Sequence, residues 1–61
     1  MRKYRIYVTN ISQAYHVLQN SAFQATEGST YVEIDIDPAK KMEVIALLNS
    51  ANVVLYDIEE V

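Results

Sequence analysis

The spacing of hydrophobic and polar residues predicts a strand and then a short helix at the start of the chain. Tyr4–Val8 (YRIYV) alternates between apolar and polar positions, as a strand with one covered face does. Ile11–Asn20 carries apolar residues at helical spacing. Asn10 precedes it as a suitable N-cap, and Gln13 follows three residues later, as in a capping box.

The middle of the chain predicts a hairpin. Ala22–Thr26 alternates weakly, whereas Thr30–Asp37 alternates strongly. Gly28 lies between them, and we expect it to take a positive φ at the turn. In the second strand, apolar and acidic residues should point to opposite faces, with Val32, Ile34 and Ile36 toward the core.

The last third predicts a helix and a final strand. Asp37 is a good N-cap and Pro38 suits the first helical position. The expected apolar stripe of this helix consists of Ala39, Met42, Ile45, Ala46 and Leu48, widened by Val44 and Leu47. Asn52 should end the helix in the left-handed conformation. Val53–Ile58 (VVLYDI) then predicts a strand that is apolar on both faces.

The resulting order of elements is β-α-β-β-α-β, which is typical of the ferredoxin-like fold. We therefore predict the α+β class, with a four-stranded antiparallel sheet in the order 4-1-3-2 and both helices on one face. In that sheet Arg5 and Tyr7 lie beside Glu33 and Asp35 on the uncovered face, where opposite charges pair across strands. The basic start of the chain should likewise meet its acidic end, Arg2 and Lys3 lying near Asp57, Glu59 and Glu60.

Composition narrows the picture further. The 61 residues, of which 51% are hydrophobic, suit one small domain spanning residues 1–61. There is no cysteine, so no disulfide or thiolate-metal site is available. The net charge of −3 argues against a nucleic-acid partner. No apolar run approaches the roughly 18 residues of a membrane span, and the cytoplasm is the expected compartment.

Three carboxylates at alternate positions, Glu33, Asp35 and Asp37, raise three possibilities: a metal site, an acid/base pair, or a solvated strand face. The solvated face is favoured, because an open sheet offers no pocket to shift a pKa and no further ligand is required to converge there. Asp37 is already used as a helix cap. His16, the only histidine, is predicted to be a surface residue of the first helix.

The five tyrosines do not indicate RNA binding, because acidic neighbours of Tyr7 would repel phosphate. We expect Tyr31 to cover the hairpin and the others to pack at the edge of the core, namely Tyr4, Tyr15 and Tyr56. No catalytic, cofactor-binding or metal site is predicted. The candidate interface residues lie on the open sheet face and the last strand: Arg5, Tyr7, Glu33, Asp35, Val54 and Tyr56.

Laid end to end, YRIYVTN, ISQAYHVLQN, STYVEIDID, AKKMEVIALLNSAN and VVLYDIEE resemble one known module. It is the C-terminal accessory domain of ATP-binding subunits of bacterial ABC transporters of the ABC-2 and bacitracin-resistance type. The resemblance covers the whole chain and consists of a pattern of apolar positions. Asn52 stands where the family usually has glycine, and the family's acidic-hydrophobic continuation after the last strand is not present here.

The resemblance implies a domain cut from a longer subunit, whose ATPase part would use ATP and magnesium to drive export, for example of peptide antibiotics. The domain itself would need no cofactor and would not be an enzyme. Its expected partners are the ATPase domain of its own chain and the twin subunit, at the inner face of the membrane and without insertion into it. The alternative is a free-standing regulatory module that binds a small ligand, similar to ACT domains.

Overall fold

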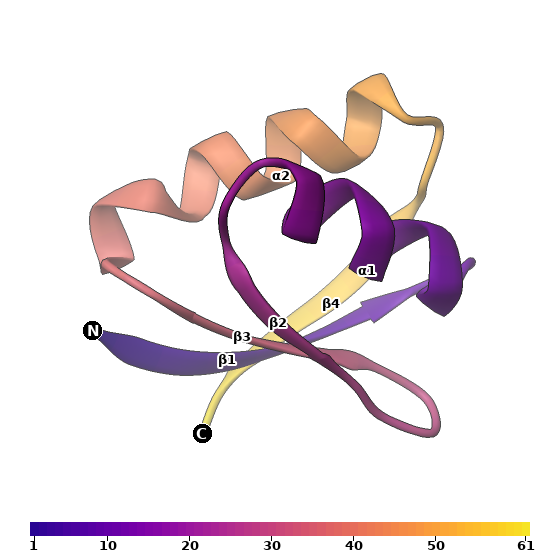
Figure 1. Ribbon diagram of the computed structural model, residues 1–61. Helices are drawn as coiled ribbons and strands as arrows, with labels where there is room; N and C mark the ends of the chain where they lie inside the picture. Colours follow the sequence, from indigo (N-terminus) through magenta and orange to yellow (C-terminus); the bar gives the residue numbers. More distant parts are fainter.

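A computed structural model describes all 61 residues and shows the predicted α+β fold. The strands are β1 (Arg2–Val8), β2 (Gln24–Glu27), β3 (Val32–Ile36) and β4 (Leu55–Glu60). They form one antiparallel sheet in the order β2-β3-β1-β4, which is the expected 4-1-3-2 order read from the other edge. The helices α1 (Ile11–Asn20) and α2 (Lys41–Ser50) lie on one face of the sheet (Figure 1). The fold is ferredoxin-like.

The core lies between the sheet and the two helices, as the alternation of the central strands predicts. β1 buries every second residue, and Ile6 is fully covered. β3 does the same with Val32, Ile34 and Ile36. α1 covers this layer with Ala14 and Leu18, and α2 with Val44 and Leu48. No polar residue is buried, so apolar packing alone holds the layers together.

The helix ends follow local sequence closely. The Asn10 side chain accepts from the Gln13 backbone N–H at 3.0 Å, which confirms the N-cap of α1. The Gln13 side chain, however, donates to the Ala51 carbonyl at 2.9 Å and therefore links α1 to the end of α2. The reciprocal half of a capping box is not formed. Asp37 accepts from the Ala39 N–H at 3.0 Å, but this caps a short 3₁₀ turn, η1 (Pro38–Lys40), that precedes α2.

The predicted apolar stripe of the second helix was only partly right. Met42 is 73% exposed and Ala46 is also exposed, whereas Val44 and Leu48 form the buried face. The physical reason is that α2 is apolar nearly all round, so its sequence does not fix which side faces the sheet. Packing selects Val44 and Leu48, which are four residues apart and therefore lie one above the other on the helix.

The outer strands and the hairpin turn also differ from prediction. β2 covers Gln24–Glu27 rather than Ala22–Thr26. β4 begins at Leu55 rather than Val53, and it extends through Glu59 and Glu60, so it is not apolar on both faces. Gly28 does not have a positive φ. It is needed for another reason: a Cβ built at this position would lie 2.4 Å from the Tyr31 ring, which occupies that space. Tyr31 thus covers the hairpin, as expected.

Both helices end in the same way. The residue after each C-cap is left-handed: Asn52 has φ 60°, as predicted, and Ala22 has φ 67°. The next N–H reaches back to the helix, from Phe23 to the Leu18 carbonyl and from Val53 to the Leu48 carbonyl. This is the Schellman arrangement, and after each helix it turns the chain back toward the sheet.

Candidate functional site

The sheet face that no helix covers, called the open face below, brings the predicted polar residues together. Arg5 lies directly opposite Glu33, and Lys3 lies opposite Asp35, across the β1–β3 pair. On the other side of β1, Arg5 faces Glu59. Because side chains alternate along a strand, these residues share one surface, as the sequence predicts.

Arg5 is the centre of this face. Its Nε donates to Glu33 Oε1 at 3.3 Å, and its guanidinium carbon lies 4.6 Å from the centre of the Tyr31 ring. The hydrogen bond to Glu33, followed by the nearby Tyr31, raises the already high pKa of Arg5, so its charge is permanent. Both partners of the ion pair remain partly exposed, so solvent screens the attraction and the pair contributes little stability.

Tyr7 lies beside this pair. Its ring meets the Tyr31 ring edge-on, with centroids 5.9 Å apart at 64°. Its hydroxyl donates to Glu59 Oε1 at 3.2 Å. Partial removal of the phenol from water, followed by this hydrogen bond, raises the pKa of Tyr7 above its ordinary value. The polar groups of Arg5, Tyr7, Glu33 and Glu59 therefore bond to one another rather than projecting freely.

The three alternating acids have separate structural settings. Glu33 pairs with Arg5, Asp37 caps η1, and Asp35 lies at the side of a surface hollow. No three side chains of the His, Cys, Asp or Glu type gather in a way that could hold a metal ion. The predicted meeting of the basic start with the acidic end is observed for Arg2, whose guanidinium lies 2.8 Å from Glu60. Lys3 faces Asp35 instead.

Val54 and Tyr56, the predicted interface residues of the last strand, are 58% and 65% exposed. Val54 precedes β4, and its backbone is tied to Thr9 by hydrogen bonds in both directions. Tyr56 lies where the β1–β4 register shifts, so it is the extra residue of a β-bulge. The prediction that Tyr56 packs at the edge of the core is therefore wrong, because the bulge takes it out of the regular alternation.

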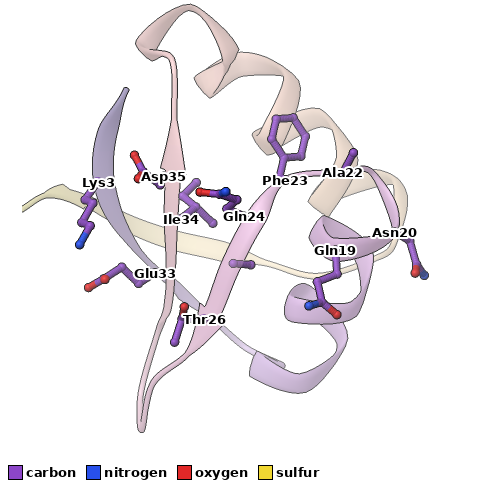
Figure 2. A pocket seen from close by; sticks show the side chains of 11 residues that line it. Lys3, Gln19, Asn20, Ala22, Phe23, Gln24, Thr26, Glu33, Ile34 and Asp35 are labelled. Carbon is purple, nitrogen blue, oxygen red and sulfur yellow. The ribbon is translucent and has the colours of Figure 1, made fainter.

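Sequence reasoning did not find the hollow beside β2 (Figure 2). It has a volume of about 710 Å³ and extends around the strand from the open face to the end of α1. Its lining includes Asp35 and Thr26 on the open face and Gln19, Phe23 and Ala25 on the helix side. The predicted sheet order already placed this strand at an edge. The hollow itself depends on how side chains from both faces of the sheet and from α1 pack around the strand, which the sequence pattern does not show.

His16 is exposed on α1 and has its ring against Tyr15, with centroids 5.5 Å apart. This confirms its surface position. Neither helix is both long and apolar enough to cross a lipid bilayer. No family model, curated protein or solved structure matches this chain.

Proposed function

We propose that the chain is a protein-contact domain without chemistry of its own, and that it serves as the accessory domain of an ATP-binding subunit of a bacterial ABC exporter. The ferredoxin-like fold agrees with the family that the sequence resembles. The observation that carries the proposal is the exposure of Val54 and Tyr56 next to an open face whose polar groups are already paired.

The distribution of surface groups supports contact rather than catalysis. On the open face, Arg5 and Tyr7 have carboxylate partners within the chain, so neither is free to act on a substrate. Val54 and Tyr56, by contrast, expose apolar surface to water, and burying such surface is favourable. Tyrosine is also among the residues enriched in protein interfaces. The ATPase domain of the same subunit is the proposed partner of this surface.

In this proposal, ATP and magnesium are bound by the ATPase part of the subunit. The domain described here either holds subunits together or regulates their association at the inner face of the membrane. The export of peptide antibiotics, as in bacitracin resistance, is the proposed process. The surface argument supports the contact, whereas the family resemblance supports the transporter.

The reading frame that precedes the Met1 codon tests the transporter assignment. We expect it to continue upstream through an ATPase domain with the phosphate-binding pattern G-x-x-x-x-G-K-[ST]. In the full subunit, Tyr56→Ser should then lower ATP-driven export while leaving the fold intact. Met42→Ser is the matched control, because Met42 is a similarly exposed apolar residue on α2. A stop codon directly upstream, or equal effects of both substitutions, would contradict the proposal.

The hollow beside β2 is the one observation that favours the alternative, a regulatory domain that binds a small ligand. Its volume of about 710 Å³ is within the range of ligand sites. The hollow is shallow and largely polar in lining, however, whereas ligand sites are mostly apolar and enclosed. A contact function fits this surface better.

A further inference from the structure

One long stretch of the chain carries no charged residue. All eight acidic and five basic residues lie outside the stretch from Ile6 to Thr26, which contains all of α1 and most of β2. The exposed positions of α1 are instead neutral side chains: Ser12, Gln13, His16, Gln19 and Asn20. Depletion of charge is the compositional mark of the centre of a protein interface. With Glu27 as the single charge of α1 and β2, the α1–β2 side therefore has the composition of a contact surface.

The two free edges of the sheet differ in how they are protected. At β4, the N–H of Ile58 is held by the Asp57 carboxylate of the same strand at 2.9 Å. β4 also has a bulge at Tyr56, and its acids Glu59 and Glu60 would repel a second copy of the same strand. Bulges and edge charges are devices that prevent strand addition. The β4 edge is thus closed to a further strand.

The β2 edge is protected only by its short length and by one acid, Glu27. The Gly28 N–H donates to the Tyr31 carbonyl at 2.8 Å, which fixes the hydrogen-bonding phase of the hairpin. Because bonding alternates along an antiparallel pair, Gln24 and Thr26 bond to β3, while Ala25 and Glu27 point their N–H and C=O groups outward. β2 contains no proline, lysine or bulge. Its outward groups can therefore accept another strand.

We propose that the β2 edge pairs with the β2 edge of a second copy of this chain, antiparallel and about a two-fold axis at Thr26. The inference rests on the proposed function and deepens it by naming the surface through which twin subunits meet. In this register Ala25 and Glu27 of one copy exchange backbone hydrogen bonds with Glu27 and Ala25 of the other. The two sheets become continuous across the pair.

Side chains and charge both select this arrangement. Face matching requires even residues of one β2 to oppose even residues of the other, which brings Thr26 opposite Thr26 on the open face. Such threonine pairs across strands are favourable. Glu27 faces Ala25, so no like charges stand directly opposite. Each copy carries a net charge of −3, and the α1–β2 side, on which α1 has no charge and β2 only Glu27, is where two copies meet with little repulsion.

A single cysteine tests the register, because the chain has no cysteine of its own. The Thr26 positions of the two copies would form a non-hydrogen-bonded pair with Cα atoms about 4.5 Å apart, close enough for a disulfide. We expect Thr26→Cys to give a covalent dimer under mild oxidation. The matched control is Gln24→Cys, on the same strand and face, whose two copies would lie roughly 13 Å apart along the strands.

The expected result is that Thr26→Cys crosslinks at least about tenfold faster than Gln24→Cys, because pairing raises its effective concentration. Adding Ala25→Pro to Thr26→Cys should abolish this advantage, since it removes an outward N–H while leaving the bonds to β3. Equal crosslinking of both cysteines, or a chain that sedimentation shows to be monomeric at every concentration, would overturn the pairing. A monomer is also the outcome if an unrelated protein covers this edge.

The pairing and the transporter assignment can fail separately. An upstream ATPase frame together with no preferential crosslink would leave the accessory-domain proposal standing and overturn the β2 pairing. A specific crosslink together with a stop codon upstream of Met1 would support the pairing and remove the transporter assignment.

Discussion

Ala22 holds a backbone conformation that glycine adopts more easily. Its φ of 67° is left-handed, where a Cβ costs about 1–2 kcal/mol. Glycine would avoid this cost but lose more freedom on folding. We expect Ala22→Gly to raise the free energy of unfolding by about 0.5–1 kcal/mol. Urea denaturation measures this change.

Ala25→Gly is the control for that substitution. Ala25 lies three residues further on, in β2, and has no left-handed strain. The same chemical change should therefore lower stability there, because glycine weakens a strand. Loss of stability at both positions would show that the left-handed turn after α1 is not strained.

The position of the Tyr31 ring depends on the absence of a side chain at Gly28. A Cβ at Gly28 would lie 2.4 Å from the Tyr31 ring, so Gly28→Ala forces that ring to move. The ring would then lose its contacts with Arg5 and Tyr7. We expect a loss of about 1–2 kcal/mol in unfolding free energy, as for other overpacked sites.

A double-mutant cycle checks this cause. In a Tyr31→Ala background, Gly28→Ala should cost less than about 0.5 kcal/mol, because the ring that it displaces is gone. If the cost is unchanged in that background, the glycine is required for its backbone rather than for the space that Tyr31 fills.

Tyr7 gives the chain a specific response to alkaline pH. Its folded-state pKa is raised, first by partial desolvation and then by the hydrogen bond to Glu59, so folding favours the protonated phenol. That contribution is complete below the ordinary tyrosine pKa and is lost as pH rises through the higher folded-state pKa. Absorbance titration should show one phenol ionising late, and Tyr7→Phe should remove it. Persistence of the late phenol in Tyr7→Phe would assign it to another tyrosine.

At the scale of elements, the sequence predicts the bounds and faces of a helix or strand best where one face is buried and the other is exposed to solvent. The bounds of α1 are those expected, since capping by Asn10 and helical spacing agree. The faces of β1 and β3 follow directly from alternation. α2 and β4 were less predictable. Apolar residues lie on nearly every side of α2, so its sequence does not fix which side faces the sheet. A bulge at Tyr56 interrupts the alternation of β4, so the sequence does not fix which of its residues point to the core.

The two helix ends show a related limit. α1 and α2 finish with the same Schellman arrangement, yet one has Asn52 and the other Ala22 at the left-handed position. Asn52 was predictable because asparagine tolerates this conformation. Ala22 was not, since alanine has no such preference. The residue that follows each left-handed position is apolar and packs with the core: Phe23 after α1 and Val53 after α2. This packing offsets the cost of the left-handed conformation.

At the scale of the whole molecule, charged residues are unevenly distributed, since α1 carries none and β2 only Glu27. The predicted pairing of Arg5 with Glu33 could be found from strand alternation and sheet order together. The charge-poor α1–β2 side could not be recognised as a surface until the fold placed α1 and β2 next to each other. Strand alternation and the predicted sheet order thus give the pairs within the sheet and its edge strands, whereas the composition of one side of the molecule depends on how helices and strands pack in three dimensions.

The two chain ends lie at one end of the same strand pair (Figure 1), where the Val61 N–H donates to the Lys3 carbonyl and Arg2 meets Glu60. Tension applied between the ends would therefore act across the β1–β4 ladder, along its hydrogen bonds rather than along the strands. The bonds would open one after another, as in a zipper, instead of sharing the load. Under mechanical force, β4 would peel away first, while β1, β3, α1 and β2 remained together.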